Sequence, residues 1–233
     1  MQVTILIPTL NEEAGIGPTL DAIDRRAFAA RGWDLEILIV DGNSRDRTRE
    51  IAESRGARVV NEPRKGYGRA YKVGFDNAEG DVIVTADADG TYPLERAQEF
   101  VAKLLDDGLD FVNCDRYGNL QRGAMSLKHR FGNMVLSTTA QALFFITLHD
   151  SQSGMWVIRR KSLRTIDYES LSEGMAFSQE IKIEFWKRRR QGMKVAELPA
   201  SLAPRIGKPV LASWKDGVKN LRGLYKLRFT RHW

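Results

Sequence analysis

The 233-residue sequence contains a single cysteine, Cys114, so no disulfide bond can form within the chain. Cys114 stands in the apolar run LDFVNC. We expect it to be a small core residue, because free cysteines are usually buried. A reducing, cytosolic setting fits this cysteine usage.

Long apolar runs are also missing. No stretch approaches the roughly 18 apolar residues that a membrane-spanning helix needs. The nearest, MVLSTTAQALFFITL at 134–148, is interrupted by Ser, Thr and Gln, which predicts a core or interfacial helix. The start, MQVTILIPTLN, lacks the basic and long apolar regions of a signal peptide.

The composition is that of a soluble globular protein, with 42% hydrophobic and 28% charged residues. The formal net charge of +6 suits anionic partners such as nucleotides, phosphates, nucleic acid or anionic lipid. We find no repeat, low-complexity tract or Pro/Gly/Ser-rich linker, so we expect one domain.

The first half alternates between apolar strand runs and helical patterns. We expect Ser44 to be a helix N-cap and Gly80 to close a helix. The pattern predicts an α/β fold with parallel strands covered on both faces, whose ligands bind at the carboxyl ends of the strands. The expected strands are 2–8, 34–41, 57–61, 81–87 and 109–115, and the expected helices are 13–30, 44–56, 68–80 and 93–108.

The second half is less regular. It predicts an apolar helical stretch over 126–148 and strands over 155–160 and 193–199. Two further helices are expected over 178–191 and 211–229.

Two carboxylates, Asp87 and Asp89, end the strand run in DVIVTADADGTYP. Such a pair can hold Mg²⁺ or Mn²⁺, which prefer oxygen ligands and share their remaining positions with water and phosphate. The alternative is that one aspartate caps the helix that begins near Pro93. A lone D-x-D pair is common by chance, so its context decides between the two.

The glycine-containing run RKGYGRAYKVG lacks the Gly-Lys-Ser/Thr of a P-loop and the third glycine of a dinucleotide fingerprint. Lys65 and the backbone of residues 66–68 could still contact an anion at a helix start. A plain helix-entry loop is an equally good interpretation.

IPTLNEE, VDGNSRDRT and ADADGTYP together resemble the family 2 glycosyltransferases, and the resemblance extends from about residue 3 to residue 210. It implies a single GT-A (Rossmann-like) domain over 1–210 with a mostly parallel central sheet. It also implies that Asp41 contacts the nucleotide base. Asp87 would lie near the ribose, and with Asp89 it would hold Mg²⁺ or Mn²⁺. The nucleotide pocket would be lined by Pro8, Thr9, Asn11 and Glu12.

CDRYG, DSQSG, AELP and RIGK resemble the polyprenyl-phosphate glycosyltransferases within that family. The resemblance implies that Arg116 and Arg130 hold a lipid phosphate, and that Arg205 and Lys208 close over the donor diphosphate. Glu180 matches an acid near the acceptor. Its alternative role is structural, as one of two glutamates on an exposed helix face. We interpret His129 and His149 as bystanders. Thr91 replaces a glutamine found in many members.

The last helix, with the tail 211–233, predicts contact with a membrane surface. Trp214, Val218, Leu221 and Tyr225 form an apolar stripe beside a basic stripe of Lys215, Lys219, Arg222 and Lys226. The alternative is a helix that packs on the sheet and exposes its lysines. We interpret KRRR at 187–190 as a solvated helix end and expect no nucleic-acid partner.

The resemblance implies an inverting, metal-dependent transfer of a hexose from a GDP- or UDP-sugar to a polyprenyl phosphate. We expect a peripheral enzyme on the cytoplasmic face of a membrane, with a membrane-embedded subunit as a further possible partner. The first alternative is transfer to a hydroxyl of a polysaccharide, glycolipid or glycoprotein, with Glu180 as the base. A nucleotidyltransferase is disfavoured because IPTLNEE lacks a basic signature.

Overall fold

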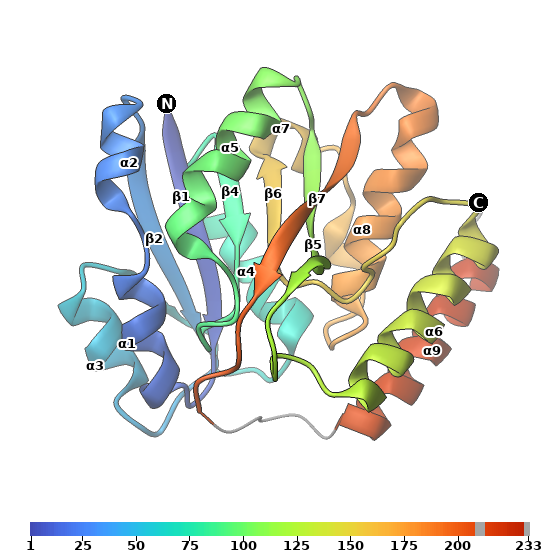
Figure 1. Ribbon diagram of the computed structural model, residues 1–233, viewed down its shortest axis with the longest axis horizontal. Coiled ribbons are helices and arrows are strands. Elements are labelled where there is room, and N and C mark those ends of the chain that lie inside the picture. The colour runs from blue at the N-terminus through green and yellow to red at the C-terminus, as the bar shows by residue number, and fades with distance from the viewer. Residues whose placement is uncertain (208–212, 231–233) are drawn as a thin grey trace.

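The computed structural model describes residues 1–207 and 213–230, except for the side chains of 213–216. Its centre is a seven-stranded sheet in the order β3-β2-β1-β4-β6-β5-β7 (Figure 1). The strands are β1 (Gln2–Thr9), β2 (Asp34–Asp41), β3 (Arg58–Asn61), β4 (Val82–Thr85), β5 (Phe111–Leu120), β6 (Trp156–Arg159) and β7 (Val195–Leu202).

The sheet is mostly parallel, as expected. β1 pairs in parallel with β2 and β4, and β5 pairs in parallel with β7. β6 lies between β4 and β5 and is antiparallel to both. The carboxyl ends of β1, β2 and β4 therefore meet at one edge of the sheet, where the predicted site residues follow them.

Helices cover both faces of the sheet, so the molecule has two main cores (Figure 1). The alternation of β1 divides them: Val3, Ile5 and Ile7 point to one core, and Leu6 points to the other. On the first face lie α1 (Glu13–Asp21), α2 (Arg25–Ala30), α3 (Thr48–Ser54) and α5 (Ala97–Asp106); on the second lie α4 (Tyr67–Asn77), α7 (Arg160–Leu163) and α8 (Phe177–Lys187). Short 3-10 turns cover Leu94–Arg96, Tyr168–Ser170 and Arg188–Gln191.

Two further helices, α6 (Leu127–Phe144) and α9 (Ser213–Thr230), lie side by side at one end of the molecule (Figure 1). Leu136 and Ala140 of α6 pack against Leu224 and Leu227 of α9, together with Ile183 of α8. Packing of α9 on the sheet was the expected alternative, and this is wrong because α9 uses α6 and α8 as its support.

One long helix over 13–30 was expected, but the chain forms two. α1 ends at Asp21, and α2 begins at Arg25 because the Asp24 carboxylate accepts a hydrogen bond from the Ala27 backbone at 3.0 Å. An aspartate in that position satisfies an unpaired amide at a helix start. The local cap therefore outweighs the continuous helical pattern.

Both predicted helix caps are wrong. α3 starts four residues after Ser44, which instead bridges two loops at the sheet edge. α4 ends at Asn77, three residues before Gly80. Gly80 is needed for close packing, because a Cβ there would lie 2.5 Å from the backbone nitrogen of Thr4.

Candidate functional site

The ends of β1 and β2 are joined by a buried carboxylate. Asp41 is fully buried, and its Oδ1 accepts hydrogen bonds from Thr9 Oγ1 at 3.1 Å and Ser44 Oγ at 2.6 Å. Its Oδ2 accepts from the Ser44 backbone at 2.8 Å and lies 3.7 Å from Arg49. These contacts hold the loop together, and the role of Asp41 in binding a base stays a prediction.

The loop after β1 is stitched to the loop after β2. The Asn11 backbone donates to Ser44 Oγ at 2.8 Å, and the Asn11 side chain accepts from the Arg45 backbone at 2.8 Å. The Glu12 backbone donates to Thr48 Oγ1 at 2.9 Å. Asn11 has a φ of 54°, a left-handed conformation that asparagine tolerates better than most residues. These contacts hold the loops after β1 and β2 in one fixed arrangement, which we call the frame.

Arg205 links this frame to the aspartate pair. Its Nη2 lies 2.5 Å from Glu12 Oε1, and its Nη1 lies 2.9 Å from Asp89 Oδ2. The other Asp89 oxygen accepts from the Thr91 backbone at 3.1 Å and from Thr91 Oγ1 at 2.7 Å. The Ile206 backbone also donates to the Asp89 carbonyl at 2.8 Å, so the segment before residue 207 closes over the aspartates.

Asp87 lies beside Asp89 and is half-buried. Burial, and then the nearby charge of Asp89, raise the pKa of Asp87 to about 7. Its carboxylate packs against Gly154, where a Cβ would lie 3.0 Å from both carboxylate oxygens. Burial likewise raises the pKa of Glu12, against the opposing charge of Arg205. One guanidinium thus pairs with Glu12 and Asp89, and Asp87 lies beside them.

This acid cluster fits a divalent cation that shares its ligands with a phosphate. Asp87 is half-buried and lies beside the charge of Asp89, and a cation held between the two carboxylates would relieve their repulsion. Within residues 1–207 and 213–230, no three His, Cys, Asp or Glu side chains gather into a complete metal site. Asp87 and Asp89 would therefore supply part of the ligand set, and water and a bound diphosphate the rest.

Arg116 is held in a buried ion pair. Its Nε and Nη2 lie 2.7 Å from the two oxygens of Asp150, which is fully buried. Burial alone would raise the pKa of Asp150, but Arg116 outweighs it and holds that pKa below its ordinary value. The charge of the Arg116 guanidinium is therefore balanced within the protein. The role of Arg116 in holding a lipid phosphate stays a prediction.

Glu180 lies in a buried part of α8. Its two carboxylate oxygens accept hydrogen bonds from the backbone and the hydroxyl of Ser172, both at 2.6 Å. The exposed helix face expected for Glu180 and Glu184 is wrong, because both residues are buried and Glu184 pairs with Arg188. The observed contacts hold the chain at Ser172, and a role at the acceptor stays a prediction.

Lys182 of α8 is a buried cation that the sequence patterns did not reveal. Its Nζ donates to the carbonyls of Ser151 at 2.8 Å and Ser153 at 2.5 Å, and to Ser178 Oγ at 3.1 Å. Burial lowers the pKa of Lys182 to about 7, against the opposing charge of Asp150. The lysine fastens the DSQSG loop, which carries both Asp150 and Gly154.

A groove of about 460 Å³ opens along α6. Arg130, Met134, Ser137, Thr138 and Gln141 repeat at helical spacing along its α6 wall. Phe131, Tyr117 and His149 complete the lining. Arg130 thus lies in a groove with both apolar and polar walls. It is not adjacent in sequence to any of the residues predicted to bind the nucleotide-sugar donor.

The glycine loop packs against protein. A Cβ at Gly66 would lie 2.5 Å from the carbonyl oxygen of Glu173, and a Cβ at Gly68 would lie 2.3 Å from that of Ser172. These glycines therefore allow α4 to approach the loop that Glu180 holds. Lys65 is exposed beside them, and its contact with an anion stays a prediction.

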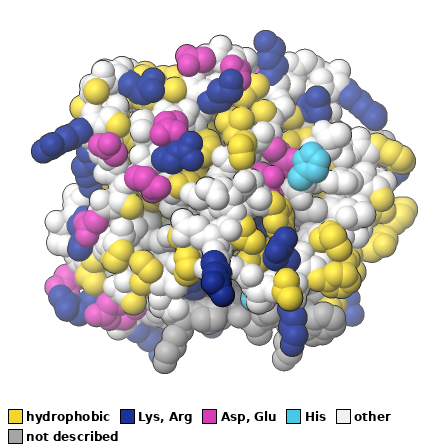
Figure 2. Space-filling view, in the orientation of Figure 1, with side chains coloured by type: hydrophobic (Ala, Val, Ile, Leu, Met, Phe, Trp, Pro, Cys, Tyr) yellow, Lys and Arg dark blue, Asp and Glu magenta, His cyan; other side chains and the backbone are white. Residues whose placement is uncertain are grey.

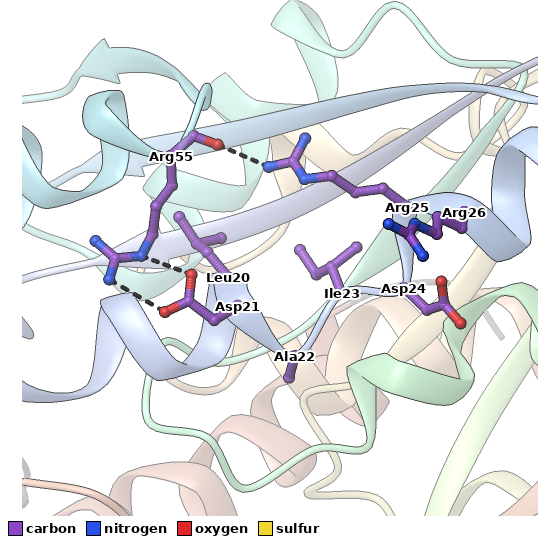
Figure 3. A pocket seen from close by; sticks show the side chains of 8 residues that line it. All are labelled: Leu20, Asp21, Ala22, Ile23, Asp24, Arg25, Arg26 and Arg55. Carbon is purple, nitrogen blue, oxygen red and sulfur yellow. Dashed lines mark hydrogen bonds and ion pairs between the residues drawn. The ribbon is translucent and has the colours of Figure 1, made fainter.

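A second cavity, of about 630 Å³, lies at the far end of α1 from Glu12 (Figure 3). Arg55 lies across it, paired with Asp21 at 2.8 Å, and Arg25 donates to the Arg55 carbonyl at 2.7 Å. A nine-residue helix is about 13 Å long. The cavity is therefore separate from the aspartate pair, and the chemistry of the site does not involve it.

Three groups of predicted residues lie outside the described part of the chain: Lys208, the side chains of Trp214 and Lys215, and residues 231–233. Sequence reasoning missed Asp150, Glu197 and Lys182. Asp150 stands in a quoted motif, DSQSG, which was a usable signal. Lys182 stands in a charged helical pattern that is typical of an exposed helix, although α8 is buried almost all round.

Comparison with known proteins places the chain in a family. The model of Glycosyl transferase family 2 matches residues 4–167. A dolichyl-phosphate hexose transferase of Haloferax volcanii is 33% identical over 227 residues, covering 97% of this chain and 93% of that protein. The low-salt glycan biosynthesis hexosyltransferase Agl6 of the same organism is 32% identical over 222 residues, covering 94% of this chain and 52% of that protein.

The fold is shared with glucosyl-3-phosphoglycerate synthase from Mycobacterium tuberculosis. Its structure with Mn²⁺, UDP and phosphoglyceric acid gives a TM-score of 0.77 at 21% identity, covering 98% of this chain and 78% of that one. Its structure with Mg²⁺ and UDP gives a TM-score of 0.71 at 21% identity, covering 97% and 79%. The sheet order, the family match and the similarity to hexosyltransferases agree, and the chain belongs to the family 2 glycosyltransferases, as a hexosyltransferase with the GT-A fold.

Proposed function

We propose that this enzyme transfers a hexose from a nucleoside-diphosphate sugar to a polyprenyl phosphate, with inversion at the anomeric carbon. The observation that carries the proposal is the convergence of Asp87, Asp89 and Arg205 at the shared carboxyl edge of β1, β2 and β4. UDP-bound fold relatives support the donor, and the similar dolichyl-phosphate hexose transferase supports the acceptor.

The donor side is assigned to the frame after β1 and β2. Pro8, Thr9, Asn11 and Glu12 would line the nucleotide, with Asp41 at their base. Lys65 and Lys208 would add positive charge. Arg205 would turn from the acids to the diphosphate, since a guanidinium binds phosphate through paired hydrogen bonds. Mg²⁺ or Mn²⁺, held by Asp87 and Asp89, would neutralise charge on the leaving diphosphate.

The acceptor side is assigned to the α6 groove. An oxygen of the acceptor phosphate attacks the anomeric carbon, the bond from that carbon to the donor diphosphate breaks, and the nucleoside diphosphate leaves. A phosphate monoester is already nucleophilic near neutral pH, so it needs positioning cations more than a base. Arg130 in the groove fits this need. Arg116, whose charge is paired with Asp150, would assist it, and Glu180 would help to orient the acceptor.

We assign membrane contact to the outer faces of α6 and α9. Leu127, Phe131 and Phe145 are 79%, 64% and 79% exposed, and Phe229 on α9 is 75% exposed. Hydrophobic side chains gather over α6 on the right of Figure 2. Arg222 and Lys226 add positive charge on α9. Exposed apolar residues beside basic ones are typical of a surface that lies in a lipid interface.

Within the described ranges, no helix is both long and apolar enough to cross a bilayer. We propose a peripheral attachment to the cytoplasmic face, where the chain would meet both donor and lipid acceptor. A membrane-embedded partner subunit remains a prediction of the sequence.

The test is a donor and acceptor panel. The protein is incubated with Mg²⁺ or Mn²⁺ and each of several UDP- and GDP-sugars, with and without farnesyl phosphate as a short polyprenyl phosphate. Released nucleoside diphosphate is measured. We expect release that depends on the lipid phosphate and falls at least 100-fold in Asp89→Asn, because the metal would lose a ligand and an anionic charge.

The matched control is Asp106→Asn, at an exposed aspartate at the end of α5. It should retain wild-type release. Release that is indifferent to lipid phosphate but lost in Asp89→Asn would contradict the acceptor assignment. It would favour a hydroxyl acceptor, for which Glu180→Gln should then abolish transfer.

A further inference from the structure

His149, which lines the α6 groove, is an exposed histidine whose ring and backbone are both held by one carboxylate. Its side chain is 72% exposed, and its ring Nδ1 lies 2.8 Å from Glu197 Oε2. The His149 backbone donates to the same oxygen at 2.7 Å. A carboxylate only accepts hydrogen bonds, so Nδ1 carries a proton in this contact and Nε2 is the nitrogen left to meet a ligand. In the imidazolium form, which Glu197 balances, Nε2 also carries a proton and can donate it to an anion.

Glu197 is itself fixed by the sheet. It lies on β7 directly opposite Asn113 on β5. Its Oε1 accepts from Asn113 Nδ2 at 2.9 Å and from the Asp150 backbone at 3.0 Å. Two strands therefore orient the imidazole. A histidine that only covers a loop would not need a fixed ring orientation, whereas a binding residue benefits from an imidazole that is already oriented.

The charges around the groove indicate the kind of ligand. Arg130 lines the groove and forms no ion pair with any residue that the structure describes. Arg116, by contrast, is only 12% exposed, and its charge is balanced by Asp150. The groove thus offers Arg130 and the imidazolium Nε2–H of His149 to an anion, and Phe131 and Met134 to an apolar chain.

We infer that His149 is a binding residue for the phosphate group of the acceptor, with Glu197 as its positioning residue. The inference deepens the proposed function and rests on it for the identity of the ligand. Arg130 and the imidazolium Nε2–H of His149 both donate to the phosphate oxygens. The first isoprene units of the acceptor lie along Phe131 and Met134.

The test measures binding and turnover separately. Farnesyl phosphate is titrated into the protein by calorimetry, and its KM is measured with the preferred donor. His149→Ala should weaken binding about tenfold or more and raise KM in parallel, with kcat within about twofold, because a uniformly used contact is lost. His149→Gln, which keeps a hydrogen-bond donor near the Nε2 position, should recover part of the affinity.

His129→Ala is the matched control. His129 is exposed in the first turn of α6 and does not line the groove, so affinity and KM should be unchanged. Farnesol, which lacks the phosphate, should bind wild type and His149→Ala equally. Equal weakening of farnesol and farnesyl phosphate would mean that His149 only supports the loop, and would overturn the inference.

Failure of the inference and failure of the proposed function are distinguishable. Lipid-dependent turnover with unchanged affinity and KM in His149→Ala would overturn the role of His149 and leave the function intact. Specific loss of farnesyl phosphate binding in His149→Ala, without turnover in wild type, would support the phosphate site and refute the transfer reaction.

Discussion

Arg205 and Glu12 lie 193 positions apart in sequence, yet the arginine bridges Glu12 and Asp89. One guanidinium balances only part of the charge of two carboxylates beside a third, Asp87. A divalent cation offers twice the charge. We therefore expect the arginine and the metal to compete for Asp89, and the guanidinium to be released when metal and diphosphate bind.

Replacing Arg205 by Gln should raise the Mn²⁺ affinity of the donor-free protein several-fold, because the competing cation is gone. Turnover should fall, because the proposed diphosphate contact is also gone. Manganese binding is followed by electron paramagnetic resonance. The control variant is Arg45→Gln, which removes the same charge from an exposed side chain in the neighbouring loop. Equal Mn²⁺ affinities of wild type and Arg205→Gln would contradict the competition.

The raised pKa of Asp87 predicts pH-dependent metal binding. With a pKa of about 7, Asp87 is mostly protonated at pH 6 and mostly ionised at pH 8. Metal ligands must be deprotonated, so the apparent Mn²⁺ affinity should rise about tenfold between pH 6 and 8. An Mn²⁺ affinity that does not change with pH, or that changes with a midpoint near pH 4, would contradict this prediction.

The same pKa affects stability with a definite sign. In the unfolded chain Asp87 ionises near its ordinary value of 3.8, whereas in the metal-free fold it ionises near 7. Between these values the folded state binds more protons, so its contribution to the free energy of unfolding falls as pH rises. Thermal denaturation at pH 8 should therefore show Asp87→Asn to be more stable than the metal-free wild type.

At the scale of elements, the DSQSG loop joins β5, α6 and α8. Asp150 pairs with Arg116 of β5, Ser151 bonds to Ser137 of α6, and Lys182 of α8 holds the carbonyls of Ser151 and Ser153. The loop also supports Gly154 behind Asp87. The positions of Asp87 and of the α6 groove are therefore linked through one short segment.

Asp150→Asn should destabilise the protein by about 3–5 kcal/mol, because it leaves Arg116 as an uncompensated buried charge. Urea denaturation measures the loss. The double variant Asp150→Asn with Arg116→Met removes that charge and should recover part of it. A loss under about 1 kcal/mol in the single variant would show that water reaches the pair.

At the scale of the whole molecule, α6 and α9 form a projecting pair of helices with apolar outer residues (Figure 1). α9 uses two faces. Leu224 and Leu227 are buried against α6 and α8. Of the predicted stripe, Val218 and Tyr225 are exposed, whereas Leu221 is half-buried and packs against the same cluster. The predicted stripe is thus divided between exposed positions and packing.

The double variant Phe131→Ser, Phe229→Ser should bind vesicles containing phosphatidylglycerol at least tenfold more weakly, because two exposed rings no longer enter the lipid. Co-sedimentation measures the binding. Lys226→Ala should weaken it further in low salt, whereas Lys161→Ala, at an exposed lysine on α7, should not. Unchanged binding in the double variant would contradict the assigned face.

The sequence by itself determined the α/β class, because apolar strand runs alternate with helical patterns. It also predicted a site at one edge of the sheet, because Pro8, Asp41 and Asp87 stand at the carboxyl ends of the expected strands, and these ends meet in a parallel sheet. The motifs pointed to the family. These are properties of short stretches, and local propensity and strand periodicity are enough to express them.

Only the tertiary structure decided which charges meet. Arg205 with Glu12, Arg116 with Asp150, and His149 with Glu197 join residues that are 193, 34 and 48 positions apart. The antiparallel direction of β6 and the burial of Glu180 and Lys182 were likewise set by packing. No local pattern encodes these features, because each depends on how separate elements come together around the two cores.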